Sequence, residues 1–260
     1  MRVSLFRLTG VLTLACAALL GAGCNSSNDS GSGTTTQSAT GIWSGSDSVS
    51  GLTVTALINS GGQATFIRSD GIQFTGSVQV SGNTLAATVD GYPDFSQTFS
   101  DGSGYGIGTL SGSVTTADTL SATLAFTTNG NTSITGTWSL TYESLSDTAS
   151  SIGAFAGTYT DAASGATFTF TSGGAISIAN SPNGCSLSGA INTADTAHNV
   201  YEVSYTYSGC TGTYQPLNGV QLTGLATINP TLSPVQAILA VAGTLNGNYF
   251  GIVSALTASS

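Results

Sequence analysis

The residues best suited to chemistry are one histidine and an aspartate near it. His198 is the only histidine of the 260-residue chain, Asp195 lies three positions earlier, and serines are abundant. These residue types suggest a Ser-His-Asp relay, in which an imidazole takes a proton from a serine hydroxyl. Such a relay needs a rigidly held imidazole beside one defined nucleophile. Because the segment around His198 is polar and is predicted to form a hairpin tip, we expect both residues to be exposed loop residues.

Two pairs of carboxyl groups suggest glycosidase chemistry, which needs two carboxyls across a cleft. Asp90 and Asp94 flank a Gly-Tyr-Pro turn, whereas Glu143 and Asp147 lie in a polar connection. Aspartate is common in turns, so we expect solvated turn residues. A single histidine and no calcium-loop motif leave no ligand set for a metal, and no phosphate-binding glycine loop follows a strand. The sequence therefore predicts no catalytic residue, no metal and no cofactor, and a protein that is not an enzyme.

The longest loop signal carries four aromatic residues and is the most distinctive candidate for binding. It includes Tyr92, Phe95, Phe99 and Tyr105, separated by glycines and polar residues. Loops of this kind on a rigid scaffold often contact ligands or proteins. The alternative is that Phe95 and Phe99 fold back and cap one end of a domain.

The composition is poor in charge and acidic. Only 6% of the residues are charged, whereas 40% are hydrophobic, which suffices for a packed core. The formal net charge of −9 becomes −11 without Arg2 and Arg7, and Arg68 is then the only cation. We expect Arg68 to pair with Asp70 or another surface carboxylate. This acidic balance repels nucleic acid and anionic lipid, so neither is a predicted partner.

The first 23 residues have the features of a cleaved export signal. An apolar run from Leu8 to Leu20 follows the arginines and is short for a membrane span. The small residues Gly21-Ala22-Gly23 then lead into Cys24 and resemble the lipobox of bacterial lipoproteins. The resemblance implies that Cys24 is lipidated and that Asn25 after it directs the protein to the outer membrane. The alternative is a plain secretory signal, which would leave a periplasmic or secreted protein.

Residues 24–40 follow the signal and form a polar, Gly/Ser-rich segment without apolar periodicity. Such a composition cannot bury enough apolar surface to become ordered. We therefore predict a flexible tether that holds the body of the protein away from a membrane.

The body alternates apolar and polar residues, which predicts half-buried β-strands. One pattern recurs in these strands: an apolar residue, Ser, Thr or Ala, a glycine, any residue, and an apolar residue. Examples are Phe74-Thr75-Gly76-Ser77-Val78 and Leu110-Ser111-Gly112-Ser113-Val114. The glycine always falls on the buried face, where it lets a strand bend or another backbone approach closely.

The pattern occurs twice in the same order, which indicates an internal duplication of ordinary domain size. The predicted units are a first β domain at 41–143, a connector at 144–153 and a second β domain at 154–260. Eight antiparallel strands with short turns can close into an up-and-down barrel, so we predict an all-β fold of two tandem eight-stranded barrels. The alternative is one sixteen-stranded membrane pore, although the strands are short for it and their outward residues are Ser and Thr.

The four cysteines divide by position. Cys16 lies in the signal and Cys24 is the lipidation candidate, whereas Cys185 and Cys210 lie in the second domain. In an exported protein two such cysteines are expected to pair, and the predicted hairpin between them brings them to the same end.

The body also resembles known barrel families. Strands of the form Leu-Ser-Gly-Ser-Val behind a lipid signal resemble the eight-stranded lobes of bacterial surface lipoproteins of the transferrin-binding protein B and factor H-binding types. Gly41-Ile42-Trp43 is similar to the first strand of the lipocalin superfamily. The resemblances imply a lipid-anchored, non-enzymatic envelope lipoprotein whose β domains bind or present surface to a partner. The alternative is a carrier of a small apolar ligand, held in a lipocalin-like cavity.

Overall fold

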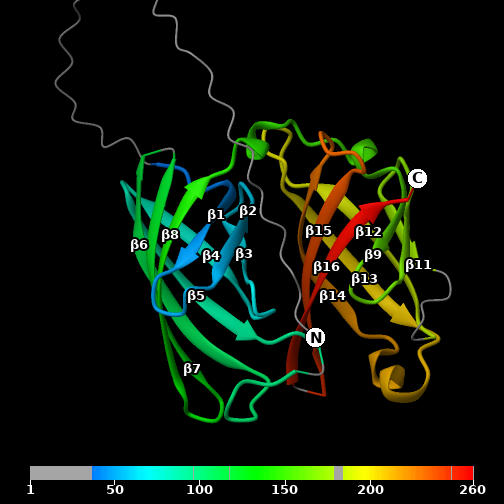
Figure 1. Ribbon diagram of the computed structural model, residues 1–260, viewed down its shortest axis with the longest axis horizontal. Coiled ribbons are helices and arrows are strands. Elements are labelled where there is room, and N and C mark those ends of the chain that lie inside the picture. Colours follow the sequence, from blue (N-terminus) through cyan, green and yellow to red (C-terminus); the bar gives the residue numbers. More distant parts are fainter. Residues whose placement is uncertain (1–36, 96, 117, 179–183, 247, 260) are drawn as a thin grey trace, which may run out of the picture.

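The protein folds into two closed antiparallel barrels of eight strands each, as predicted (Figure 1). The computed structural model describes residues 37–95, 97–116, 118–178, 184–246 and 248–259. The predicted signal, Cys24 and most of the predicted tether lie outside these residues. Each sheet closes on itself, so the sixteen strands do not form one large barrel. Among the described residues, no helix is both long and apolar enough to cross a membrane.

Barrel 1 is an up-and-down barrel in which each strand pairs with the next and the last pairs with the first. Its strands are β1 (Gly41–Asp47), β2 (Thr53–Ile58), β3 (Gln63–Arg68), β4 (Gln73–Ser81), β5 (Thr84–Tyr92), β6 (Gly106–Thr116), β7 (Thr119–Thr128) and β8 (Ser133–Tyr142).

Barrel 2 repeats this topology, and β16 closes it against β9. Two short 3-10 turns, η1 (Ser144–Asp147) and η2 (Ile152–Phe155), join the barrels, and η3 (Gly212–Leu217) follows β13. The strands are β9 (Gly157–Asp161), β10 (Thr167–Phe170), β11 (Ala175–Ile178), β12 (Ser186–Thr193), β13 (Tyr201–Ser208), β14 (Gln221–Asn229), β15 (Gln236–Leu245) and β16 (Asn248–Ala258).

Glycines on the inner face let neighbouring strands cross closely. A Cβ added to Gly112 would overlap the carbonyl oxygen of Ser121, and one added to Gly76 would overlap that of Thr88. In barrel 2, a Cβ on Gly224 would overlap the carbonyl oxygen of Ala240. No other residue type fits such contacts, so the recurring glycine marks where the sheet curls, as predicted.

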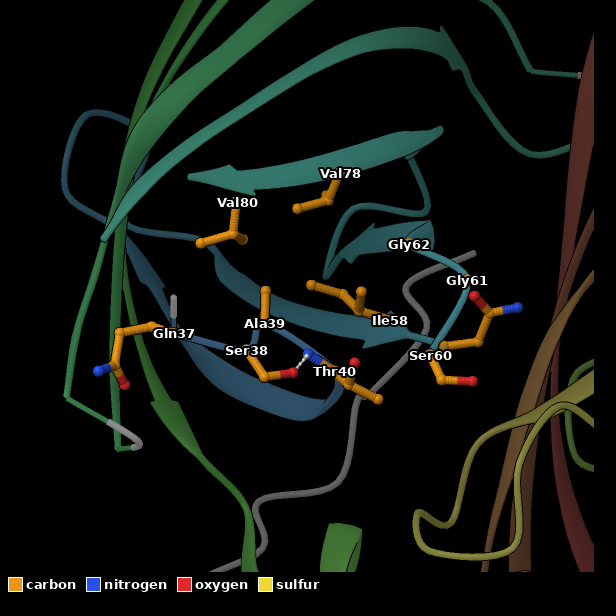
Figure 2. A pocket seen from close by; sticks show the side chains of 11 residues that line it. Gln37, Ser38, Ala39, Thr40, Ile58, Ser60, Gly61, Gly62, Val78 and Val80 are labelled. Atoms are coloured by element: carbon orange, nitrogen blue, oxygen red, sulfur yellow. Dashed lines mark hydrogen bonds between the residues drawn. The ribbon is translucent and has the colours of Figure 1, made fainter. Parts of the chain in front are cut away.

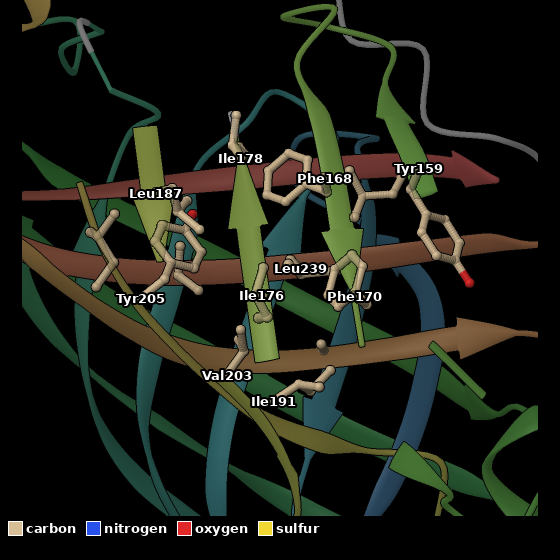
Figure 3. Close-up of a cluster of buried hydrophobic side chains, with 14 of the residues drawn as sticks. Tyr159, Phe168, Phe170, Ile176, Ile178, Leu187, Ile191, Val203, Tyr205 and Leu239 are labelled. Atoms are coloured by element: carbon tan, nitrogen blue, oxygen red, sulfur yellow. The ribbon is translucent and has the colours of Figure 1, made fainter. Parts of the chain in front are cut away.

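The interior of each barrel is filled by its own side chains. In barrel 1 the ring of Trp138 lies 5.2 Å from Phe66 and 5.7 Å from Phe74, centroid to centroid. In barrel 2 the inward aromatic and aliphatic side chains converge in the same way (Figure 3). Side-chain filling is typical of barrels of eight strands.

The barrel ends are covered by segments outside the strands. Ala39 covers barrel 1 where the chain enters, and its carbonyl oxygen accepts a hydrogen bond of 2.8 Å from Trp43 Nε1. Phe99 packs against Phe126 inside the opposite end, 5.5 Å between centroids. In barrel 2, Phe155 of η2 and Leu217 of η3 are both buried in the core.

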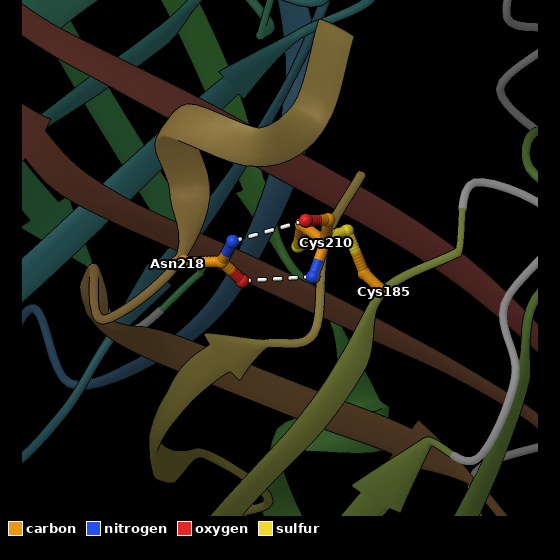
Figure 4. The surroundings of a disulfide bond; sticks show 3 residues. All are labelled: Cys185, Cys210 and Asn218. Atoms are coloured by element: carbon orange, nitrogen blue, oxygen red, sulfur yellow. Dashed lines mark hydrogen bonds between the residues drawn. A yellow bond between two sulfur atoms is a disulfide. The ribbon is translucent and has the colours of Figure 1, made fainter. Parts of the chain in front are cut away.

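The predicted disulfide between Cys185 and Cys210 is present, with a Cα–Cα distance of 4.0 Å (Figure 4). It joins the start of β12 to the segment after β13. Asn218 holds the same segment, because its side chain accepts a hydrogen bond of 2.8 Å from Cys210 N and donates one of 3.0 Å to Cys210 O. The bridge thus fixes the base of the η3 loop on barrel 2.

Replacing Cys185 and Cys210 together by serine should destabilise the protein by about 3 kcal/mol, because a bridge over 25 residues restricts the unfolded chain. Chemical denaturation measures the change. Reduction of the wild-type protein is the matched control and should give the same loss. Equal stability of the double variant and the oxidised protein would contradict the prediction.

Candidate functional site

The two barrels lie side by side (Figure 1), and they share an apolar seam. Ile42 and Leu57 face outward from barrel 1, yet both are buried against Val200 and Leu225 of barrel 2. Leu145 of η1 covers this cluster. The barrels therefore meet through apolar residues of their outward faces.

The aromatic loop crosses the seam at the end opposite to the chain entry. Asp94 pairs with Gly251 of β16, and Phe95 N donates a hydrogen bond of 2.9 Å to Gly251 O. The ring of Phe95 lies 5.1 Å from Phe250 and 5.8 Å from Tyr214, centroid to centroid. A residue of the barrel 1 loop thus completes the core of barrel 2.

The other aromatic residues of the loop divide between the core and the surface. Phe99 caps barrel 1, which is the alternative given for it above. Tyr92 is 1% exposed, and its hydroxyl bonds to Thr75 Oγ1. Tyr105 stacks on Tyr249 of barrel 2 at 4.3 Å, and its hydroxyl donates a hydrogen bond of 2.6 Å to Asp90. Of the four predicted binding residues, Tyr105 is the one that stacks on an exposed aromatic ring, because Tyr249 is 39% exposed.

A glutamine is enclosed where β4 meets β16. A Cβ on Gly251 would overlap Gln73 Nε2 and would lie 2.9 Å from Tyr92 Cδ2, so only glycine fits there. Gln73 is fully buried, and neither polar atom of its side chain has a hydrogen-bond partner among the described residues. An unsatisfied buried amide costs free energy, so this part of the seam holds together through close packing.

At the entry end, a polar cluster joins the barrels around Asn59. Its Nδ2 donates to Glu202 Oε1 of barrel 2 at 3.1 Å and to Gln63 Oε1 at 3.3 Å. Its Oδ1 accepts a hydrogen bond of 2.9 Å from Gln63 N. Asn59 is only 3% exposed, and its amide groups are fully used. This turn between β2 and β3 therefore positions a carboxylate of the other barrel.

His198 and Asp195 lie in the same region and contact each other. His198 Nδ1 is 3.2 Å and 3.3 Å from the two carboxylate oxygens of Asp195. Burial would raise the pKa of Asp195, but hydrogen bonds from the His198 and Ala197 amides and from Ser60 lower it below its usual value. The structure thus brings histidine and aspartate together, and within the described part of the chain Ser60 bonds to the carboxylate of this pair rather than to the imidazole.

The other candidate carboxylates and the single cation have local partners. Glu143 accepts a hydrogen bond from Ser44, and Asp147 accepts one of 2.9 Å from Tyr142. Arg68 pairs with Asp70 through Nε at 3.0 Å and Nη2 at 2.6 Å, as predicted. The side chain of Arg68 is 9% exposed and that of Asp70 is 34% exposed, so the pair is partly buried, at the end of barrel 1 opposite to the chain entry.

The entry end of barrel 1 carries a depression of about 210 Å³, which we call the mouth pocket (Figure 2). Ala39, Ile58, Val78 and Val80 converge on its floor. Its polar lining comes from the entering chain and from the turn at 59–62, where Asn59 bonds to Glu202 of barrel 2. Most of the accessible lining is polar, and the floor is apolar, although Ala39, Ile58 and Val78 are themselves almost fully buried.

A second depression of about 160 Å³, which we call the crevice, lies between the barrels. It is lined by Gln63 of barrel 1 and by outward residues of barrel 2, including Asn192, Glu202 and Thr223. Asn59 connects the two depressions, because it lines the mouth pocket and bonds to Glu202 in the crevice. The two depressions are therefore neighbours, one with an apolar floor and the other with a carboxylate.

Sequence reasoning missed Asn59, Gln63 and Glu202 as site residues. Asn59 ends a predicted strand directly before the turn signal Ser60-Gly61-Gly62, a pattern that predicts no site residue. Glu202 carried a usable signal, since it is the one charged residue of β13, whose other outward residues are Ser and Thr. Its partner lies 143 positions away, however, and no local pattern could identify it.

Asp94→Asn should stabilise the protein at pH 7 and flatten its pH dependence. Burial in the seam is the main cause that raises the pKa of Asp94 to about 6, and the negative charge of the neighbouring Asp161 adds to it. Hydrogen bonds from the Phe95 and Val253 amides oppose this rise in pKa. Between pH 4 and 6 the folded state therefore binds more protons than the unfolded state, and stability falls as pH rises. With a discount for partial exposure, the gain at pH 7 is about 1–2 kcal/mol.

Denaturation curves from pH 4 to 7 check this, and Asp101→Asn is the opposite control. Hydrogen bonds from Ser103 and Thr128 lower the pKa of Asp101, so its replacement should reduce stability at pH 7. A wild-type pH profile retained in Asp94→Asn would refute the role of Asp94.

Comparison with protein families and with curated proteins identifies no relative whose function could be assigned to this site. The chain matches no protein-family model and no curated protein. The function of the protein is therefore inferred from the geometry of the two barrels and of the seam between them.

Proposed function

We propose that this chain is a lipid-anchored, non-enzymatic envelope lipoprotein that presents the outer surface of its paired barrels to a partner. The observation that carries the proposal is that aromatic and aliphatic side chains fill both barrels. Trp43 and Tyr205, which could have lined a cavity, are 0% and 2% exposed and pack within the cores. With the interior occupied, the outer surface and the barrel ends are left for binding.

The place where the chain enters supports anchoring at one end. Gln37 N donates a hydrogen bond of 2.8 Å to Gly82 O, so the chain reaches barrel 1 at the end opposite to the aromatic loop. From Cys24 to Gln37 an extended chain reaches about 45 Å. A lipid on Cys24 would thus hold the entry end of barrel 1 within about 45 Å of the membrane, at the outer membrane by the rule given for Asn25.

An exposed group at the far end is the best candidate for the partner surface. Ile107 is 55% exposed and Tyr249 is 39% exposed, and Tyr105 stacks on Tyr249 across the seam. We call Tyr105, Ile107 and Tyr249 the ledge. Tyrosine and exposed aliphatic residues are typical of protein contact surfaces, and the ledge spans both barrels.

The non-enzymatic part of the proposal is supported by the arrangement around His198. The imidazole contacts Asp195, but Ser60 bonds to the same carboxylate, whereas a Ser-His-Asp relay needs the serine hydroxyl to bond to the imidazole. The carrier alternative ranks second, because the barrel centres are filled and the mouth pocket is confined to one end of barrel 1.

Replacing Cys24 by serine should abolish lipid attachment, because the thiol is the acylated group of a lipoprotein signal. Incorporation of radiolabelled palmitate in the native host measures it, together with release of the protein from the membrane fraction. Cys16→Ser changes a cysteine within the signal and should leave labelling intact. Labelling that persists in Cys24→Ser would contradict the anchor.

A photo-crosslinking residue at Ile107 should trap a discrete partner in cells, because this side chain is exposed on the ledge. The same probe at Thr135, an exposed outward position on β8, is the matched control and should trap much less. Equal trapping at both positions, or none at either, would argue against the ledge as the partner surface.

A further inference from the structure

We propose that the mouth pocket and the crevice together bind a primary amine carried on a short aliphatic stem. The stem would lie in the mouth pocket and the ammonium group against Glu202. This goes beyond the surface-presenting role, and its failure would leave that role untouched.

The mouth pocket suits an aliphatic stem. Ile58 is 1% exposed and Val78 is 7% exposed, and both meet Ala39 and Val80 on the pocket floor (Figure 2). At about 30 Å³ per water, its volume equals about seven waters. Water on the apolar floor has fewer hydrogen-bond partners than water at the polar rim, so an aliphatic group that replaces it on the floor gains free energy.

The crevice suits a cation. Glu202 accepts one hydrogen bond, from Asn59, whereas a carboxylate has about four acceptor sites. Arg68 is the only Lys or Arg among the described residues, and Asp70 neutralises it through two hydrogen bonds. The carboxylate of Glu202 is thus left to a cation from outside, which the acidic chain attracts.

The two halves are close enough for one small molecule. Asn59 lines the mouth pocket, and its Nδ2 lies 3.1 Å from Glu202 Oε1. A stem that leaves the pocket over Asn59 therefore reaches the carboxylate directly. Because Gln63 N and Gln63 Oε1 both hold the Asn59 amide, this geometry is preorganised.

The test compares three probes of equal length: hexylamine, 1-hexanol and hexanoate. Isothermal titration calorimetry on the full-length chain carrying Cys24→Ser avoids detergent, which would compete for an apolar pocket. We expect hexylamine to bind about tenfold more tightly than 1-hexanol, because it adds a charge-assisted hydrogen bond, and hexanoate to bind most weakly. Fluorescence of the tryptophans gives a second readout, since Trp43 bonds to Ala39 in the pocket floor.

Two variants separate the halves of the site. Glu202→Gln should reduce hexylamine affinity about tenfold and leave 1-hexanol unchanged, whereas Val80→Trp should fill the pocket and weaken both probes at least tenfold. Glu143→Gln is the control, because this carboxylate bonds to Ser44 and lines neither depression. Thermal unfolding checks that each variant is folded.

The outcomes decide the proposal. A hexylamine preference that Glu202→Gln removes supports it. No binding of hexylamine, or the same amine preference in Glu202→Gln, overturns it. Vesicles of phosphatidylethanolamine test a lipid source of the amine, and binding to these vesicles without binding of hexylamine also overturns the proposal.

Discussion

The close crossing of neighbouring strands at inward glycines is the constraint on which the rest of the structure depends. At Gly76, Gly112 and Gly224 the carbonyl oxygen of the next strand occupies the place of a side chain. A sheet that bends this sharply can close with eight strands, and a barrel of that size is narrow enough for aromatic rings to fill it. Closure pairs every strand on both sides, so neither barrel offers an edge to another chain.

A close approach at a glycine also joins the two barrels. Gly251 lies on an outward face, and the absence of a side chain there lets Gln73 and Tyr92 of barrel 1 pack directly against β16. Phe95 then enters the core of barrel 2, although it belongs to a loop of barrel 1. The domains suggested by the duplication are therefore two closed sheets but share part of one core. The seam is closely packed at Gly251, and it is sensitive to charge at Asp94, whose pKa is raised by burial and by the neighbouring Asp161.

The sequence predicted the fold closely because the signals for it are local. Alternation at Ile134, Trp138 and Leu140, glycine turns and paired cysteines each act within one hairpin, and all led to correct strands or to the observed bridge. The seam could not be predicted in this way. Ile42 and Leu57 break the alternation by being apolar on the outward face, but nothing local says that Val200 and Leu225 cover them. The same limit applies to Asn59 and Glu202, which meet only after both barrels have closed.

Filling the barrels moves any binding chemistry to their ends and to the line where they meet. Barrel interiors hold a ligand only when the inward side chains leave room, and here rings such as Phe74 and Phe126, 5.2 Å apart, leave none between them. An end is different, because the strands stop and short segments cover the core incompletely. At the entry end of barrel 1 this cover is Ala39 and its neighbours, and the uncovered part is the mouth pocket. The second barrel adds what a single barrel lacks, a carboxylate beside an apolar floor, so the pairing of two similar barrels creates a site that neither has alone.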